Sequence, residues 1–166
     1  MLRARTLAKL AVGVVILLVT FVVGWLSGRT GIGSIVEPAS LSEAERVFVE
    51  RMNGASLVGQ FTIAGREDRA GRPERYDISG VEKVGEDQWR FNARIRYGSI
   101  DTTAPVVVPM RFLGDTPMIS MTDLTIPGMG TFTVRLFFYD DRYAGSWQHG
   151  EFGGHMFGRI EKNTTN

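Results

Sequence analysis

Apolar and polar residues alternate with a period of two along most of the chain from position 56 to 162. This pattern is typical of strands with one buried and one solvated face. The clearest run covers 89–97, where Trp, Phe, Ala, Ile and Tyr alternate with polar residues, and the runs 57–63 and 132–138 repeat it. Five less regular strands are predicted around 76–84, 106–112, 118–124, 143–148 and 155–161.

The segments between these strands are mostly short and rich in turn residues, such as Gly114-Asp115-Thr116-Pro117 and Pro127-Gly128-Met129-Gly130. About eight strands joined as hairpins, without helices between them, predict an all-β antiparallel domain over 56–162. The phase of the alternation breaks at Ser79-Gly80, which predicts a bulge. A barrel and a sandwich share this strand pattern, so both stay open.

A short amphipathic helix is predicted over 42–53, directly before the β domain. Ser42 and Glu45 have the spacing of a capping box, and Asn53-Gly54 is a typical C-terminal stop. One face of this helix should pack on the β domain and carries Ala44, Val47, Phe48 and Met52.

A different pattern stands at the N-terminus, where seventeen uncharged, mostly apolar residues run from Leu10 to Leu26 after a basic stretch. About 20 apolar residues cross a bilayer, and basic residues stay on the cytoplasmic side. We therefore expect a cytoplasmic segment 1–9, a single-pass transmembrane signal anchor 10–28, a tether 29–41, and a periplasmic or extracellular C-terminal domain. The alternative is a signal peptide cleaved near Gly28, which would give a secreted domain.

Charge and cysteine content narrow the function classes. Four of the nineteen basic residues and none of the eighteen acidic ones precede position 30, which leaves a net charge of −3 beyond it. A mixed, mildly acidic surface argues against binding of nucleic acid. The chain has no cysteine, so disulfides and a cysteine-linked lipid are excluded.

The C-terminal stretch 143–160 is the most distinctive part of the sequence. It is predicted as a closing hairpin in which Gly153-Gly154 forms the turn, and glycine alternating with Trp147 indicates a backbone covered by a large ring. The chain here resembles small bacterial membrane-anchored envelope proteins of no assigned function that end in a G-[ST]-W … G-G-H-x-F-G-R-I hairpin. That resemblance covers most of 42–161 and implies no activity. Gly145-Ser146-Trp147 is also similar to the G-x-W motif of lipocalin-like barrels, where the motif belongs to the first strand.

Two groups of residues in the β domain are candidate binding sites. His149, Glu151 and His155 would form a metal site if the hairpin brought them together, and the alternative is that they are polar residues of an exposed turn. A long solvated loop between the first two strands is predicted to carry arginines that contact a protein partner or lipid headgroups, or that only solubilise it. These arginines are Arg66, Arg69, Arg72 and Arg75.

We find no catalytic signature and no cofactor motif, so we expect no enzyme. The first hypothesis is a membrane-anchored interaction module whose partner is an envelope protein or a lipid. The second is a lipocalin-like barrel that binds a lipid or another small apolar ligand, and a metal site at the C-terminal hairpin is the third. A large apolar cavity would favour the second, because the same aromatic residues can also fill a solid core. These residues are Phe61, Trp89, Phe91, Phe132, Phe138 and Trp147.

Overall fold

The computed structural model describes residues 40–66 and 70–162 as one short helix and eight strands. The predicted anchor 10–28, nearly all of the tether 29–41, and Arg69 lie outside the described residues. Within the described ranges, no helix has the length and apolar character needed to cross a bilayer. In chain order the elements are α2 (Glu43–Met52), β1 (Ala55–Phe61), β2 (Arg72–Lys83), β3 (Gln88–Tyr97), β4 (Ile100–Leu113), β5 (Thr116–Ile126), β6 (Gly130–Tyr139), β7 (Arg142–His149) and β8 (Phe152–Lys162).

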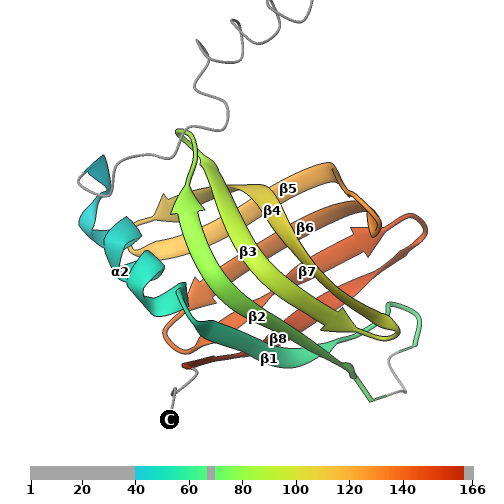
Figure 1. Ribbon diagram of the computed structural model, residues 1–166. Helices are drawn as coiled ribbons and strands as arrows, with labels where there is room; N and C mark the ends of the chain where they lie inside the picture. Colours follow the sequence, from blue (N-terminus) through green and yellow to red (C-terminus); the bar gives the residue numbers. More distant parts are fainter. Residues whose placement is uncertain (1–39, 67–69, 163–166) are drawn as a thin grey trace, which may run out of the picture. The chain divides into compact units, whose positions relative to one another are not determined.

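The eight strands form a closed antiparallel barrel (Figure 1). Each strand pairs with the next one in sequence, and β8 pairs with β1 from Ala55↔Lys162 to Phe61↔Met156. The register shifts between Ile78 and Gly80, which confirms the predicted bulge, and a second shift lies between Met121 and Leu124. The alternation predicted the strands. The pairing of β1 with β8 closes them into a barrel, so the sandwich alternative is excluded.

Two strands begin earlier than the sequence pattern indicates. β4 begins at Ile100 rather than near 106, because polar or small residues at 101–104 occupy both faces of the strand and give no apolar alternation. β2 begins at Arg72, where Pro73 argues against a strand. Pro73 faces Gln60 of β1, whereas the pairing with β3 starts only at Glu74, so the proline lies beyond the part of β2 that needs two neighbours.

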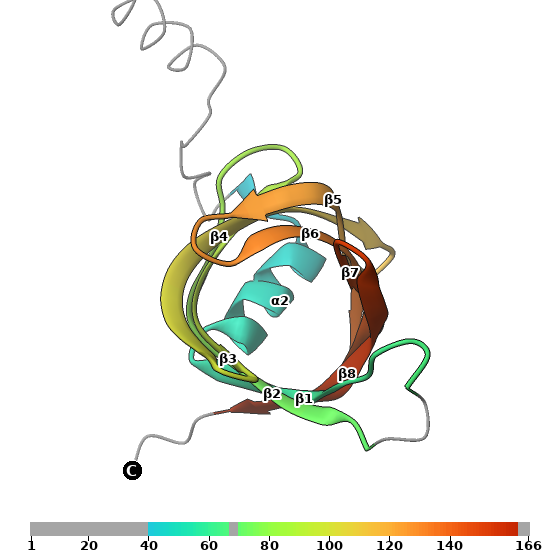
Figure 2. The same cartoon turned by 90° about the vertical axis from the view of Figure 1, so that its right-hand side faces the viewer.

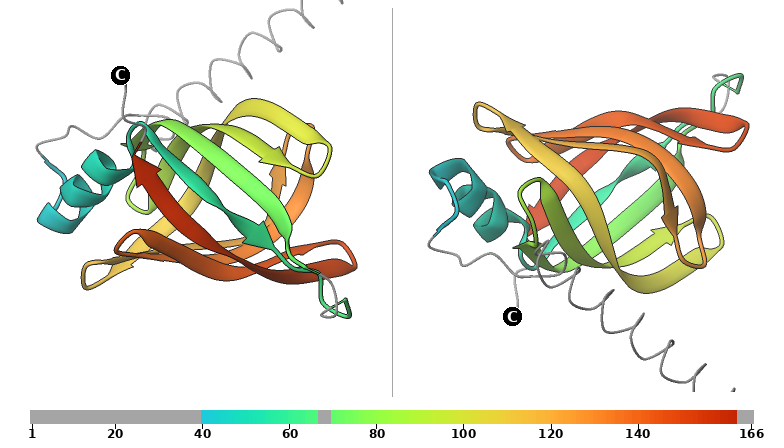
Figure 3. Two further views of the ribbon diagram at one scale, coloured as in Figure 1. Left: turned by 90° about the horizontal axis from the view of Figure 1, so that it is seen from below. Right: turned by 90° about the horizontal axis from the view of Figure 1, so that it is seen from above.

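The helix α2 closes one end of the barrel (Figures 2 and 3), and the described part of the β1–β2 connection lies at the other end. The predicted capping box between Ser42 and Glu45 is present. Met52 is fully buried, but Val47 is 49% exposed while Val49 packs against the core, so the prediction for Val47 is wrong: the face that packs is turned toward Val49. Phe48 enters the barrel and packs edge-on or tilted, at centroid distances of 5.4–6.3 Å, against rings of four inward residues, Trp89, Phe91, Phe112 and Phe138.

Polar contacts fix α2 in this position. Lys83 forms an ion pair with Glu45 at 2.6 Å, and the Asn53 side-chain oxygen accepts a hydrogen bond of 2.8 Å from the Val81 amide. The Lys162 ammonium donates to the carbonyls of Glu50 and Asn53, both at 2.7 Å. These contacts satisfy the backbone groups that a helix C-terminus leaves without partners. The closed end is therefore held by packing and by specific hydrogen bonds together.

Candidate functional site: the barrel lumen

The inward faces of all eight strands enclose a cavity of about 520 Å³. Its wall is almost entirely apolar, and only three of the side chains that line it carry a full charge: Arg66, Arg72 and Glu74. Phe91 and Phe138 line the cavity and also contact Phe48, so their rings lie between the helix and the cavity at the closed end. Much of the remaining wall is formed by Leu57, Ile78, Ala93, Ile95, Val106, Val108, Ile119, Met121, Ile126, Val134, Leu136 and Met156.

Aromatic rings surround the cavity toward the end opposite α2, which we call the mouth. The Phe61 ring packs edge-on against Trp147 at 5.7 Å and against Tyr97 at 6.1 Å. Two residues further along β7 from Trp147, His149 stacks on Phe132 of β6 at 4.5 Å. Of the six aromatic residues singled out in the sequence, all but Trp89 line the cavity, and Trp89 belongs to the packed cluster around Phe48. The same residue class therefore fills one end of the barrel and lines a cavity at the other.

Glu74 places a carboxyl group in this apolar wall. It is 5% exposed, and it accepts hydrogen bonds from the hydroxyls of Tyr143 at 2.9 Å and Tyr76 at 3.0 Å. Burial raises the pKa of Glu74 above its ordinary value, and the two hydrogen bonds oppose that rise. Burial next to the Glu74 carboxylate also raises the pKa of Tyr143, so its hydroxyl stays a donor.

Glycines on β8 and β1 give Tyr143 its path to Glu74. A Cβ atom added at Gly158 would lie 2.7 Å from Cε1 of the Tyr143 ring, and one at Gly59 would meet the Tyr143 hydroxyl. Trp147 also faces a glycine, Gly154 of β8. Its indole N–H donates a hydrogen bond of 3.2 Å to the carbonyl of Thr62, which lies on the far side of β8. A large ring thus covers the backbone at Gly158, whereas next to Trp147 the prediction is not met, because a Cβ at Gly145 or Gly154 would meet backbone atoms of a neighbouring segment.

The predicted place of the Gly153-Gly154 pair is wrong. The turn of this hairpin is formed by Gly150-Glu151, where Gly150 has a φ of +58°, and both predicted turn glycines lie within β8. A Cβ at Gly154 would collide with the Thr62 carbonyl, so glycine is needed there for close approach of two strands.

The predicted arginine loop is shorter than expected, and its residues divide into two groups. Arg66 lies in the β1–β2 connection and Arg72 begins β2, and both line the mouth of the cavity. Within residues 40–66 and 70–162, neither guanidinium has a hydrogen-bond or ion-pair partner. Arg75, in contrast, lies within β2 on the outer face and is not part of a loop.

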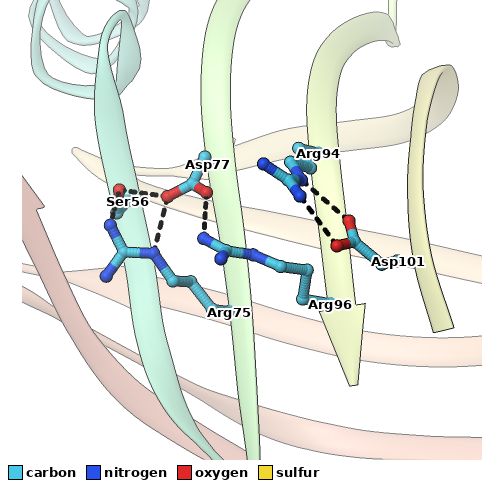
Figure 4. A network of polar contacts seen from close by, with 6 residues as sticks. All are labelled: Ser56, Arg75, Asp77, Arg94, Arg96 and Asp101. Carbon is cyan, nitrogen blue, oxygen red and sulfur yellow. Dashed lines mark hydrogen bonds and ion pairs between the residues drawn. The ribbon is translucent and has the colours of Figure 1, made fainter. Parts of the chain in front are cut away.

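Arg75 belongs to a network of polar side chains on the outer face of β1–β4 (Figure 4). Arg75 bonds to Asp77 at 2.7 Å and to Ser56 at 2.8 Å, and Arg96 reaches the second oxygen of the same carboxylate. Burial opposes ionisation of Asp77, but the hydrogen bonds from Ser56 and Arg75 lower its pKa overall. Arg75 is thus explained by cross-strand contacts and is not offered to a ligand.

The candidate metal ligands do not converge. His149 lines the mouth, where its Nδ1 lies 2.9 Å from the Thr131 carbonyl, whereas His155 is exposed in a shallow groove on the outer face. Glu151 is exposed in the turn between them. Across the described part of the chain, no three His, Cys, Asp or Glu side chains are grouped so that they could hold a metal ion.

Sequence reasoning missed Glu74 and Tyr76 as lumen residues. The signal was the alternation Arg72, Glu74, Tyr76, Ile78, which places all four side chains on the inner face of β2. Pro73 and the neighbouring charges concealed the start of this strand. Chemically, the lumen offers an apolar chamber, one buried acceptor and, at its mouth, two cations for which the described part of the chain supplies no partner.

Comparison with known proteins assigns nothing to this site. No family model matches the chain, and no curated protein or solved structure is significantly similar to it. The resemblances to membrane-anchored envelope proteins and to lipocalin-like barrels therefore stay predictions.

Proposed function

We propose that the barrel is a binding protein that holds one small, largely apolar ligand, such as a lipid, in its lumen. The observation that carries this proposal is the apolar cavity of about 520 Å³, which is lined by residues of all eight strands. Ligand pockets have volumes of about 300–1,000 Å³ and mostly apolar walls with a few polar groups. Small barrels either fill their interior with side chains or hold one small ligand.

The cavity favours this function over that of an interaction module without a ligand. A solid core would need the inward side chains to meet across the barrel axis, as they do around Phe48 at the closed end. Toward the mouth the same alternation leaves the chamber open, and an empty apolar chamber forfeits the dispersion contacts that a filled core provides. A ligand with a matching apolar surface would restore those contacts.

The test is to fill the chamber and measure ligand binding. Ala93 lies on the cavity wall of β3, so Ala93→Phe places a ring in the lumen. Ala144→Phe is the matched control, because Ala144 lines the groove on the outer face between Phe137 and Phe157. Binding of dibromostearic acid to the full-length chain in amphipol is followed by bromine quenching of tryptophan fluorescence, since Trp147 lines the lumen.

We expect saturable quenching with one ligand per wild-type chain, a loss of at least about tenfold in affinity for Ala93→Phe, and unchanged affinity for Ala144→Phe. Circular dichroism establishes that each variant is folded, and Val108→Phe replaces Ala93→Phe if the latter does not fold. Absence of saturable binding to the wild-type chain, or equal loss in both variants, would overturn the proposal.

A further inference from the structure

We propose that the ligand is an anionic single-chain amphiphile, whose chain occupies the lumen and whose acidic head binds between Arg66 and Arg72 at the mouth. This inference rests on the proposed function and names the class of ligand. Its basis is that the two guanidiniums lie on the cavity, that no described residue neutralises them, and that the rest of the chamber suits a chain.

Arg66 and Arg72 stand out among the arginines of the barrel because they line the cavity and have no polar partner among the described residues. Most of the other arginines engage carboxylates on the outer surface. Arg94 forms a two-pronged pair with Asp101, in which both distances are 2.7 Å, and Arg111 pairs with Asp87 at 2.6 Å. A guanidinium presents a planar fork of donors that matches a carboxylate or a phosphate. No acceptor within residues 40–66 and 70–162 occupies the forks of the two arginines at the mouth, so a ligand can bind there.

The one carboxylate of the cavity wall does not neutralise these cations. Glu74 lies two residues from Arg72 on the same face of β2, yet it forms no ion pair with it, and each of its two oxygens accepts a hydrogen bond from a tyrosine hydroxyl. Among the described residues, the charged groups at the mouth therefore carry a net positive charge, which favours an anionic head and repels a cationic one.

The shape of the chamber selects the rest of the ligand. Its wall between the mouth and Phe48 is apolar apart from Glu74 and the tyrosine tips, and its volume lies in the lower half of the range for ligand pockets. One flexible hydrocarbon chain fits such a volume better than the two chains of a phospholipid. The aromatic rings of Phe61, Tyr97 and Trp147 would contact the chain below the head.

A matched pair of ligands separates the head from the chain. Dibromostearic acid and its methyl ester share the hydrocarbon but differ in charge, and both are titrated against the full-length chain in amphipol by tryptophan quenching. A long-chain alkyl phosphate, used as a competitor, distinguishes a phosphate head from a carboxylate head. The variant is Arg66→Gln/Arg72→Gln, and its control is Arg142→Gln/Arg159→Gln, which removes the same charge from exposed positions on the outer faces of β7 and β8.

We expect the wild-type chain and the control to bind the acid about tenfold more tightly than the ester, a factor that corresponds to one or two charge-assisted hydrogen bonds at an exposed site. The affinity of Arg66→Gln/Arg72→Gln for the acid should fall to its affinity for the ester, whereas its affinity for the ester should equal that of the wild-type chain. Stronger competition by the alkyl phosphate than by the acid assigns the head to a phosphate, and the reverse assigns it to a carboxylate; either supports an anion site.

Two failures have different meanings. If acid and ester bind equally to the wild-type chain, or if the outer control loses as much as the mouth variant, the anion site is wrong while the apolar chamber stands. If neither ligand binds, the proposed function itself is wrong.

Discussion

The two ends of the barrel are built from the same alternation of inward apolar residues, yet one is solid and the other is hollow. At the α2 end, Phe48 fills the space between Trp89 and Phe138. At the mouth, the rings of Phe61 and Trp147 pack along the wall and leave the axis of the barrel empty. The difference comes from an element outside the barrel strands, since the one helix of the described residues lies at the closed end.

The comparison extends to one glutamate near each end. At the closed end burial of Glu45 opposes its ionisation, but hydrogen bonds from Lys83 and Ser42 outweigh this effect and lower its pKa. In the lumen, burial of Glu74 outweighs the hydrogen bonds from its two tyrosines and raises its pKa. The direction of the pKa shift thus distinguishes two kinds of carboxyl group. A lowered pKa marks a carboxyl group whose ionised form is stabilised by its partners, and a raised pKa marks one whose ionised form is destabilised by burial.

The largest effect is expected from removing the aromatic side chain that fills the closed end of the barrel. Phe48→Ala removes the ring that four inward aromatic residues contact, and truncation of a buried Phe costs about 3–5 kcal/mol. We expect this loss in the unfolding free energy measured by chemical denaturation. Val47→Ala, on the exposed side of the same helix, should cost less than about 0.5 kcal/mol. Similar losses in both variants would mean that α2 is not a specific plug.

A smaller effect is expected where the wall of the lumen holds its carboxyl group. Tyr143→Phe removes the donor to one oxygen of Glu74 and leaves it buried without that partner, which should cost about 1–3 kcal/mol. Tyr139→Phe is the control, since the Tyr139 side chain is 68% exposed. Denaturation of both variants at neutral pH gives the measurement. A cost for Tyr143→Phe no larger than for Tyr139→Phe would show that the hydrogen bond contributes nothing net to stability.

The smallest effects are the pH dependences of the two glutamates, which should have opposite signs. Because the folded-state pKa of Glu74 is raised, its contribution to stability is present below its ordinary pKa of 4.5 and is lost as the pH rises above that value. Because the folded-state pKa of Glu45 is lowered, its contribution is present above 4.5 and is lost as the pH falls.

Denaturation at a series of pH values measures both. The difference in unfolding free energy between wild type and Glu74→Gln should fall with rising pH, whereas the difference between wild type and Glu45→Gln should rise. Two differences with the same slope would contradict the contrast between the ends.

Much of this fold follows from local sequence patterns, since the capping box at Ser42 and the strict alternation in 89–97 each determine their element. Closure of the barrel does not follow from them. It depends on the pairing of β1 with β8, residues about a hundred positions apart, and on glycines such as Gly59 that let two backbones approach. A local hydrophobic pattern gives no information about contacts between residues so far apart in the sequence.

The site was harder to predict than the fold for a physical reason. An inward Phe has the same period whether it contacts another ring, as Phe138 contacts Phe48, or faces a cavity, as Phe132 does. Arginine spacing in 66–75 likewise joined residues that the structure separates: Arg72 faces the mouth and Arg75 the outer network. The two arginines can be distinguished only if the first residue of β2 is known, and Pro73 obscures that start in the sequence.

Closure by β1 and β8 also constrains how the chain reaches its folded state. Until β8 has been synthesised, β1 has only β2 as a neighbour and presents an unpaired edge to any other extended chain. The contacts of Tyr143 with Glu74 and of Trp147 with Thr62 also span the closing strands, so they cannot form before that pairing. Joining ends so distant in sequence carries the largest loop-closure entropy in the barrel, which makes it a late step of folding. An incomplete chain is thus an open sheet that exposes the apolar lining of the lumen.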